Sequence, residues 1–231
     1  MSKQEDFTLR KNQGEPTYEV HGLFPVPVYT KENLINIDEL LLLDGVKDIP
    51  TDPTAANWDY GDRSENTYIL DLPGLFKLKL KLDECLQEYA NQVMGLAGEY
   101  SITQSWLSIK RESHRHVMHS HSNSIISGVF YFGNTDDAAG LTFSKNSVSN
   151  TWQITPLLNP NVQNNFTFTD ITLKVENSMV CLFPSWLAHR VEPNKTNNTR
   201  YCIAFNACAK YALGSEKDLT ELEFFRLDRK E

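Results

Sequence analysis

The sequence predicts a mainly β protein, a jelly-roll barrel with flanking helices (α+β). From residue 100 onward, alternating or continuously apolar runs are separated by polar turns, which is the pattern of seven or eight short strands. The longest stretches with helical periodicity lie before that region, within residues 31–97. A chain of 231 residues that is 40% hydrophobic and 11% aromatic can bury one sizeable core, so we expect a single domain with residues 100–210 as its barrel.

The N-terminal part of the chain is expected to support the barrel. Residues 1–18 are polar without periodicity, which is typical of a loosely ordered arm. Residues 22–29 carry two prolines among apolar residues and suit an edge strand or an extended lead-in. In residues 31–46 the leucines and isoleucines follow helical spacing, and Gly45 would close that helix. Residues 47–66 are rich in Asp, Pro, Thr and Asn and predict a long loop near the barrel mouth, a candidate substrate lid.

The longest predicted helix covers residues 73–97. It has a proline in its first turn, and glycines at its end would stop it. Lysines and leucines alternate over residues 77–81, as they would in a strand, but the length of the whole pattern favours a helix. We expect it to pack outside the sheet as scaffold. Its apolar positions at three-to-four spacing are Leu75, Leu78, Leu82, Leu86, Tyr89 and Val93.

The predicted strands follow in order along the rest of the chain. Residues 105–112 and 165–175 alternate between polar and apolar side chains, which indicates one buried face. Continuous apolar runs at 126–132 and 179–183 indicate strands buried on both faces. The remaining predicted strands are residues 140–144, 151–155 and 200–208.

A group of histidines is the candidate metal site. His119 and His121 point to the same face of an extended strand, with Cα atoms roughly 6.5 to 7 Å apart. His189, the only histidine downstream of this pair, follows a buried apolar run and can supply a third ligand from a distant strand. Three histidines on one side of a metal leave the opposite side open for substrate and oxygen. His114 and His116 have the same spacing as the later pair and stay an alternative to it.

Four segments carry a resemblance to a known protein family. They are L-F-P-V-P-V-Y at 23–29, H-S-H followed by S-G-V-F-Y-F, F-P-S-W-L-A-H-R-V-E-P-N from residue 183, and Arg200 ahead of I-A-F-N. Over most of its length the sequence resembles the Fe(II)- and 2-oxoglutarate-dependent oxygenases, whose fold is a double-stranded β-helix, a cupin-like barrel. It is most similar to a poorly characterised branch found in bacteria and phages. Most of the superfamily has His-x-Asp where this chain, like that branch, has His119-x-His121.

The resemblance implies a dioxygenase in which His119, His121 and His189 bind Fe(II). It also implies 2-oxoglutarate as cosubstrate and O2 as a partner in the reaction. An all-histidine face is neutral, so the choice of iron over zinc, nickel or copper does not follow from the usual triad. The implied activity is hydroxylation of an unidentified substrate, either a protein side chain such as proline or a small metabolite.

The resemblance also points to cosubstrate residues. Arg200 stands where the family has a basic residue for the far carboxylate of 2-oxoglutarate, which a guanidinium can grip with two parallel hydrogen bonds. Tyr131 stands where related enzymes use a tyrosine hydroxyl for the same carboxylate, with a core aromatic as the competing interpretation. Asn206 is a weaker candidate for cosubstrate binding, and Trp106 and Trp186 are expected to be packing residues. No catalytic group is expected beyond the metal ligands.

Composition restricts the partners and the compartment. The formal net charge of −8 and a pI near 5.3, without a long basic run, make nucleic acid an unsuitable partner. The four cysteines show no C-x-x-C spacing and suit a reducing cytoplasm, that of a bacterium or of a phage-infected host cell. The polar N-terminus is not expected to act as a signal peptide, and no apolar run is long enough for a membrane span. A homodimer is compatible with a barrel of this size.

Two other interpretations of the same barrel stay open. The first is a cupin-like metalloprotein that does not use 2-oxoglutarate, because such proteins also combine H-x-H with a distant histidine. Two features count against it: the glutamate that cupins carry shortly after the pair is missing from S-N-S-I-I, and Trp186 replaces a cupin glycine. The second is a non-catalytic binding or structural protein.

Overall fold

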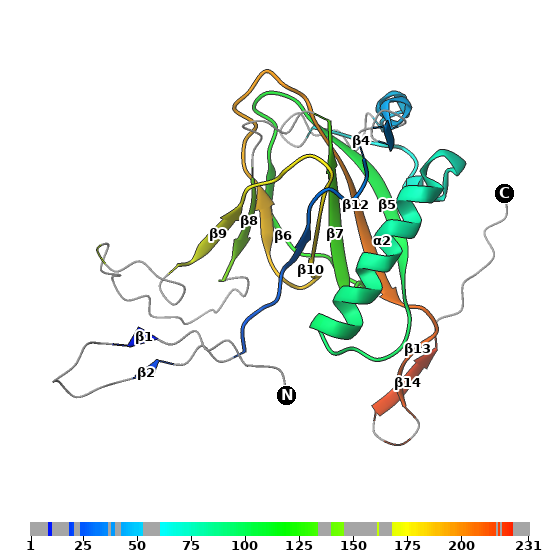
Figure 1. The fold of residues 1–231 in the computed structure, drawn as a ribbon, viewed down its shortest axis with the longest axis vertical. Coiled ribbons are helices and arrows are strands. Elements are labelled where there is room, and N and C mark those ends of the chain that lie inside the picture. The colour runs from blue at the N-terminus through cyan, green and yellow to red at the C-terminus, as the bar shows by residue number, and fades with distance from the viewer. Residues whose placement is uncertain are drawn as a thin grey trace.

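The computed structural model describes residues 9–10, 19–20, 24–36, 38–39, 43–52, 61–133, 140–145, 161, 168–215, 217 and 219–223. Within these residues, two antiparallel sheets lie side by side and a helix covers the outer face of the larger one (Figure 1). This arrangement confirms the predicted jelly-roll barrel with flanking helical structure. The space between the sheets is the part of the fold that matters for function.

The larger sheet has the strand order β3-β10-β7-β12-β5-β4. Its central strands β10 and β7 are buried along their whole length apart from one position, as their continuous apolar runs indicated. The bounds of its strands are β3 (Tyr29–Lys31), β4 (Asp62–Arg63), β5 (Tyr100–Lys110), β7 (Ile126–Phe132), β10 (Met179–Pro184) and β12 (Arg200–Ala209).

The smaller sheet has the order β6-β11-β8-β9 and faces the inner side of the larger one. Its strands are β6 (His116–His119), β8 (Leu141–Ser144), β9 (Asp170–Leu173) and β11 (His189–Val191). One cluster of buried side chains comes from both sheets and includes Leu141, Phe143, Cys181, Phe183 and Cys202. Cysteines 181 and 202 are free thiols in this cluster, so they act as small hydrophobic side chains, as expected.

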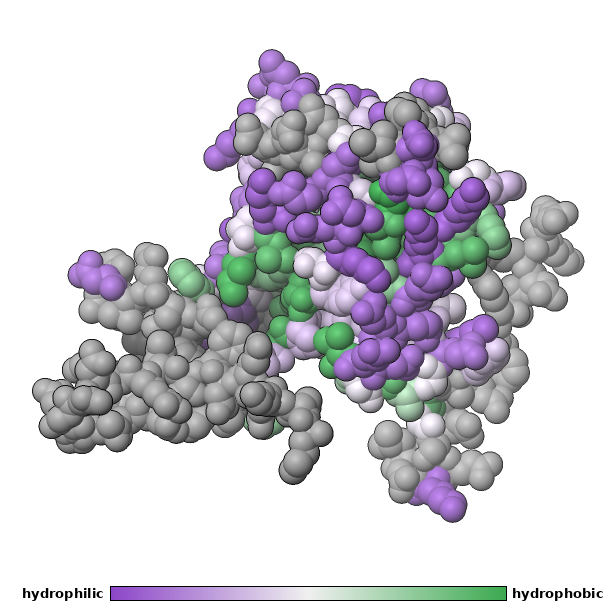
Figure 2. Space-filling model, viewed as in Figure 1, coloured by the Kyte–Doolittle hydropathy of each residue, from purple (hydrophilic) through white to green (hydrophobic). Residues whose placement is uncertain are grey.

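The predicted long helix is confirmed and packs on the outer face of the larger sheet. It begins with 3-10 turns at η2 (Ile69–Asp71) and η3 (Pro73–Leu75), continues as α2 (Phe76–Glu88) and ends in the π-helical turn η4 (Tyr89–Val93). The predicted apolar stripe is buried up to Tyr89, but Val93 is 47% exposed. The prediction for Val93 is wrong because a π turn adds a residue and shifts the buried face. The outward side of α2 is largely hydrophilic (Figure 2).

The helix predicted over residues 31–46 has different ends. Lys31 is the last residue of β3, which pairs with β10 at the sheet edge, as the two preceding prolines suggested. Residues 38–39 are helical, whereas Gly45, expected to close the helix, lies inside the 3-10 helix η1 (Asp44–Asp48). Pairing with β10 overrides the local helical spacing at Lys31, because each ladder bond satisfies a backbone group that a helix start would leave without a partner.

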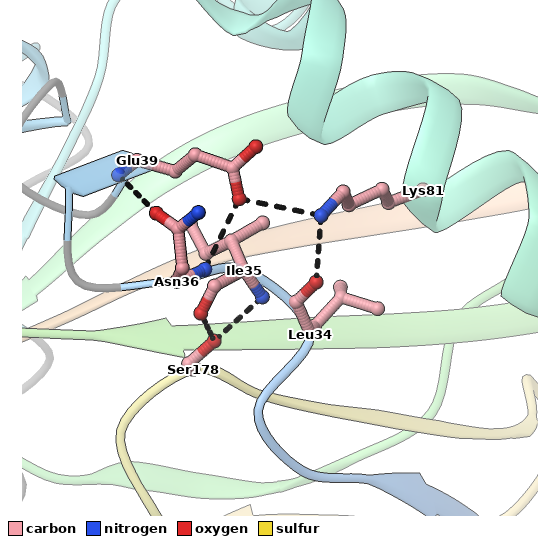
Figure 3. Close-up of polar contacts among 6 residues, drawn as sticks. All are labelled: Leu34, Ile35, Asn36, Glu39, Lys81 and Ser178. Carbon is pink, nitrogen blue, oxygen red and sulfur yellow. Dashed lines mark hydrogen bonds and ion pairs between the residues drawn. The ribbon is translucent and has the colours of Figure 1, made fainter.

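The segment after β3 is fastened to both the helix and the sheet (Figure 3). Lys81 of α2 donates to a carboxylate oxygen of Glu39 at 3.3 Å. The Ser178 hydroxyl accepts from the Ile35 backbone N–H at 2.9 Å and donates to the Ile35 carbonyl at 2.8 Å. Asn36 and Glu39 exchange two further bonds, each side chain accepting from the other's backbone N–H. These bonds tie β3 to the scaffold without involving the space between the sheets.

Several predictions fall outside the described residues. They concern most of the 1–18 arm, residues 53–60 of the candidate lid and the strand at 151–155.

Two small hairpins flank the barrel: β1 (Leu9–Arg10) with β2 (Glu19–Val20), and β13 (Ala212–Ser215) with β14 (Leu219–Glu223). Across the described part of the chain, no helix has both the length and the apolar character that a membrane span requires.

Candidate metal centre

The smaller sheet brings the three predicted metal ligands together. His119 is the last residue of β6, His189 is the first of β11, and the two are direct register partners. His121 lies just beyond β6, where its backbone N–H donates to the Ser185 carbonyl at 2.9 Å instead of continuing the ladder. The ring centroids of the three histidines are 4.3 to 5.2 Å apart. The strand pairing thus supplies two ligands and the following turn supplies the third.

Backbone carbonyls orient two of the rings. Nδ1 of His119 lies 2.8 Å from the Val117 carbonyl oxygen, and Nδ1 of His189 lies 2.9 Å from the Leu187 carbonyl oxygen. A carbonyl oxygen can only accept, so in the neutral ring Nδ1 carries the hydrogen and Nε2 keeps its lone pair. Both rings are therefore held in the tautomer that binds a metal through Nε2.

A polar network orients the third ring. Nδ1 of His121 lies 2.5 Å from the carboxamide oxygen of Asn206, which also accepts from the Ser127 hydroxyl at 3.0 Å. Ser127 contacts the Ser185 hydroxyl at 2.8 Å, and Ser185 donates to Ser124 at 2.8 Å. Asn206 was predicted to bind the cosubstrate, and this stays a prediction. In the structure its carboxamide oxygen lies against the ring of His121. Supporting bonds of this kind fix the ring and raise its basicity toward a metal.

The three histidines form one group of candidate ligands without a carboxylate. Their candidate ligand atoms all lie within 4.8 Å of one another, and they are the one such group of histidine, cysteine or carboxylate side chains among the described residues. Burial lowers the pKa of His119, and it lowers the pKa of His189 to about 3. Both rings therefore stay unprotonated near neutral pH, where protons do not compete with a metal for the lone pair.

The alternative histidine pair does not form. His116 lines the cavity and stacks on His119, with centroids 4.2 Å apart, but it is not part of the converging group. His114 accepts a hydrogen bond at Nδ1 from the backbone N–H of Arg111 at 3.1 Å and does not line the cavity. His116 is the first residue of β6 whereas His114 lies before the strand, so the two are not held together on one strand.

A cavity of about 190 Å³ connects the histidines with the residues predicted to bind the cosubstrate. Arg200, the first residue of β12, is only 2% exposed, and its guanidinium carbon lies 5.2 Å from the centroid of the Tyr131 ring. Tyr131, on β7, is fully buried, and its hydroxyl finds no hydrogen-bond partner within the described ranges. Burial raises the pKa of Tyr131 well above its ordinary value, so the hydroxyl stays a donor.

Three cavity residues were not predicted as functional. Lys110 is directly opposite Arg200 in register, is 4% exposed, and has a pKa that burial lowers to about 8. Trp106, expected to be a packing residue, lines the cavity with its ring 6.1 Å from that of His121. The guanidinium carbon of Arg63 lies 5.5 Å from the centroid of the Trp106 ring. The alternation of residues 105–112 puts Trp106 and Lys110 on one face, but nothing in it says that this face is the inner one.

The prediction for the other tryptophan is wrong. Trp186 was expected to be a packing residue, but it is 58% exposed. It lies between β10 and β11 in the turn that leads to His189, where the Leu187 N–H donates to the Pro184 carbonyl at 2.9 Å. The neighbouring Leu187 takes the buried position, because the turn directs only one of the two side chains inward.

Residues 104–206 match a protein-family model described as "Putative 2OG-Fe(II) oxygenase". The matched part of the chain contains the three converging histidines, Tyr131 and Arg200. No curated protein sequence matches the chain.

Several solved structures have the same fold at low sequence identity. The non-heme α-ketoglutarate-dependent epimerase SnoN from nogalamycin biosynthesis aligns with a TM-score of 0.60 and 11% identity over 88% of this chain and 92% of its own. HygX from Streptomyces hygroscopicus, solved with nickel, 2-oxoglutarate and hygromycin B, gives 0.57 and 12% over 80% and 84%. The viral collagen prolyl hydroxylase of Paramecium Bursaria Chlorella virus-1, solved with 2-oxoglutarate, gives 0.50 and 9% over 79% and 95%. These likenesses show the double-stranded β-helix fold.

Proposed function

We propose that the chain is a 2OG-Fe(II) oxygenase, a dioxygenase that uses Fe(II), 2-oxoglutarate and O2 to hydroxylate its substrate. One observation carries the proposal. A single cavity holds three converging histidines and, on its wall, a buried arginine beside a buried tyrosine hydroxyl that has no hydrogen-bond partner among the described residues. The first set suits a metal and the second suits a carboxylate.

The ligand set fits an iron ion with open positions. Imidazole nitrogens suit Fe(II), as they also suit zinc, copper and nickel. His119, His121 and His189 would hold the ion from one side, and the cavity lies on the other. Because each Nδ1 is engaged in a hydrogen bond, the three Nε2 atoms are the ones that bind.

The far end of the cavity fits the second carboxylate of 2-oxoglutarate. A buried hydroxyl without a hydrogen-bond partner costs roughly 1–3 kcal/mol, which a bound acceptor would recover. A carboxylate can accept from the Tyr131 hydroxyl and from the Arg200 guanidinium together, and the guanidinium would also balance its charge. We therefore assign Tyr131 and Arg200 to this carboxylate.

When bound, Fe(II) with 2-oxoglutarate and O2 supplies an oxidant strong enough to hydroxylate an unactivated C–H bond, while 2-oxoglutarate becomes succinate and carbon dioxide. The residues of the chain bind and orient. The Phe183 ring packs edge-on against the His189 ring, with centroids 4.7 Å apart, and the Phe143 ring packs against Phe183. These two rings keep water from one side of His189. Asn206 holds His121, and Arg200 with Tyr131 sets the direction in which the cosubstrate enters. A protein side chain such as proline and a small metabolite are the two candidate substrate classes.

An anaerobic titration with Fe(II) and then 2-oxoglutarate tests the proposal. We expect a visible metal-to-ligand charge-transfer band that needs both additions. His189→Ala should abolish it, and Arg200→Ala should raise the 2-oxoglutarate concentration needed to form it by at least tenfold, the loss of a charge-assisted pair. His114→Ala is the matched control, because it removes a histidine that does not face the cavity.

The result also separates the alternatives. Iron binding without a band on addition of 2-oxoglutarate would point to a cupin-like metalloprotein. Absence of tight metal binding in the wild-type protein would leave a non-catalytic binding protein on the same barrel.

A further inference from the structure

The side chains that line the cavity carry more positive charge than is needed to bind the cosubstrate. Among the described residues that line it, three are cationic, Arg63, Lys110 and Arg200, and the one acid is Asp62. Asp62 already pairs with Arg111, which lies outside the cavity. This concentration of cations is notable in a chain whose formal net charge is −8.

The all-histidine ligand set leaves this surplus in place. On the proposed function, which this inference rests on, the two charges of Fe(II) cancel the two of 2-oxoglutarate. A ligand carboxylate would add a negative charge, but His121 stands at that position and adds none. The lining of the cavity therefore keeps a formal excess of positive charge after both have bound, and in a partly buried cavity such an excess favours an anionic ligand.

Arg63 is the cation placed to meet a molecule that binds last. It lies on β4 opposite Ser108, with its guanidinium over the ring of Trp106. It is exposed, whereas Lys110 and Arg200 are buried. Within the part of the chain that the structure describes, its guanidinium makes no ion pair. Stacking on Trp106 restricts the side chain while leaving its N–H donors available.

Trp106 connects this arginine with the metal site. Its ring lies 6.1 Å from that of His121, so a group bound by Arg63 would hold the rest of its molecule beside the metal ligands. We propose that the primary substrate is a small molecule with a carboxylate or phosphate group, and that Arg63 on its Trp106 platform binds this group. Arg63 is thus a specificity-determining residue for the anionic end of the substrate.

Calorimetry on the anaerobic protein loaded with Fe(II) and saturating 2-oxoglutarate tests this proposal. The probes share a phenyl ring that can contact Trp106 and differ in charge: phenylacetate, phenyl phosphate and neutral phenylacetamide. We expect at least one anion to bind about tenfold more tightly than the amide, since a charge-assisted bond replaces a neutral one. The comparison of the two anions distinguishes a carboxylate from a phosphate as the preferred group.

Variants assign the preference to Arg63. Arg63→Gln should bring the anions within about twofold of the amide, the residual expected for a neutral donor. Lys210→Gln is the matched control, because Lys210 also lies over an aromatic ring, that of Tyr211, but outside the cavity. It should keep the preference.

Several results would overturn the inference. They are equal or undetectable binding of all three probes, a preference that survives Arg63→Gln, and loss of the charge-transfer band on adding an anion, which would mean displacement of 2-oxoglutarate. If the band never forms, the proposed function itself fails and the inference falls with it. The band before the probe is added therefore distinguishes the two failures.

Discussion

Replacing Tyr131 by phenylalanine should change stability and cosubstrate binding in opposite directions. The ring is fully buried, and its hydroxyl has no hydrogen-bond partner among the residues described. Removing that hydroxyl spares the cost of a buried, unsatisfied donor, roughly 1–3 kcal/mol. We expect Tyr131→Phe to raise the free energy of unfolding of the metal-free protein by about 1 kcal/mol, or Tm by roughly 2–4 °C for a chain of this length.

The same change should weaken 2-oxoglutarate binding. A hydrogen bond to a charged group contributes about 1.5–3 kcal/mol, so the dissociation constant should rise by at least about tenfold. Tyr89→Phe is the matched control. Tyr89 is equally buried, but its hydroxyl donates to the Pro27 carbonyl at 2.9 Å on the far side of the sheet. Its loss should lower stability by about 1 kcal/mol and leave cosubstrate affinity unchanged.

Thermal and denaturant unfolding of the metal-free variants, followed by anaerobic titration of the charge-transfer band, measures both quantities. The reasoning is refuted if Tyr131→Phe destabilises the protein as Tyr89→Phe does, since its hydroxyl would then be satisfied without a ligand. It is equally refuted if 2-oxoglutarate affinity is unchanged.

Three other variants test separate parts of the structure. Asn206→Leu removes the acceptor of the His121 Nδ1–H, and chelator competition should show metal affinity falling about 10–100-fold. Gly128→Ala would make its Cβ overlap the Phe205 ring, so denaturant unfolding should show a loss of about 1–3 kcal/mol. The pKa of Lys110 falls from 10.5 to about 8 on folding, so the unfolded chain binds more protons between these values and stability gains from rising pH there. Unfolding measured from pH 7 to 10 should show this gain in the wild-type protein relative to Lys110→Met, and parallel curves would contradict it.

Local patterns were sufficient for most elements of the barrel. Largely apolar runs predicted β7 and β10, because a strand buried on both faces carries apolar side chains at most positions. The long helix followed from its leucine spacing up to Tyr89. The helix predicted over residues 31–46 failed at Lys31, where pairing with β10 decides the conformation and local spacing carries no information about that partner.

Local patterns likewise predicted some residues of the candidate site and missed others. The period-two spacing of a strand, with the family resemblance, was enough to select His119, His121 and His189. Trp106 was misjudged and Lys110 was overlooked, because alternation assigns residues to a common face without saying which face points inward.

The sequence by itself determined most strands of the larger sheet and the outer helix, since these depend on residue type and spacing along one segment. Together with the family resemblance, it also selected His119, His121 and His189 as candidate metal ligands. Only the tertiary structure decided what surrounds them. The pairing of Arg200 with Lys110 depends on the register of β12 against β5, which lie at opposite ends of the barrel sequence. The hydrogen bond from His121 to Asn206 and the position of Arg63 over Trp106 likewise join segments that no local pattern connects. Register and packing bring such groups into contact, and both are properties of the whole fold.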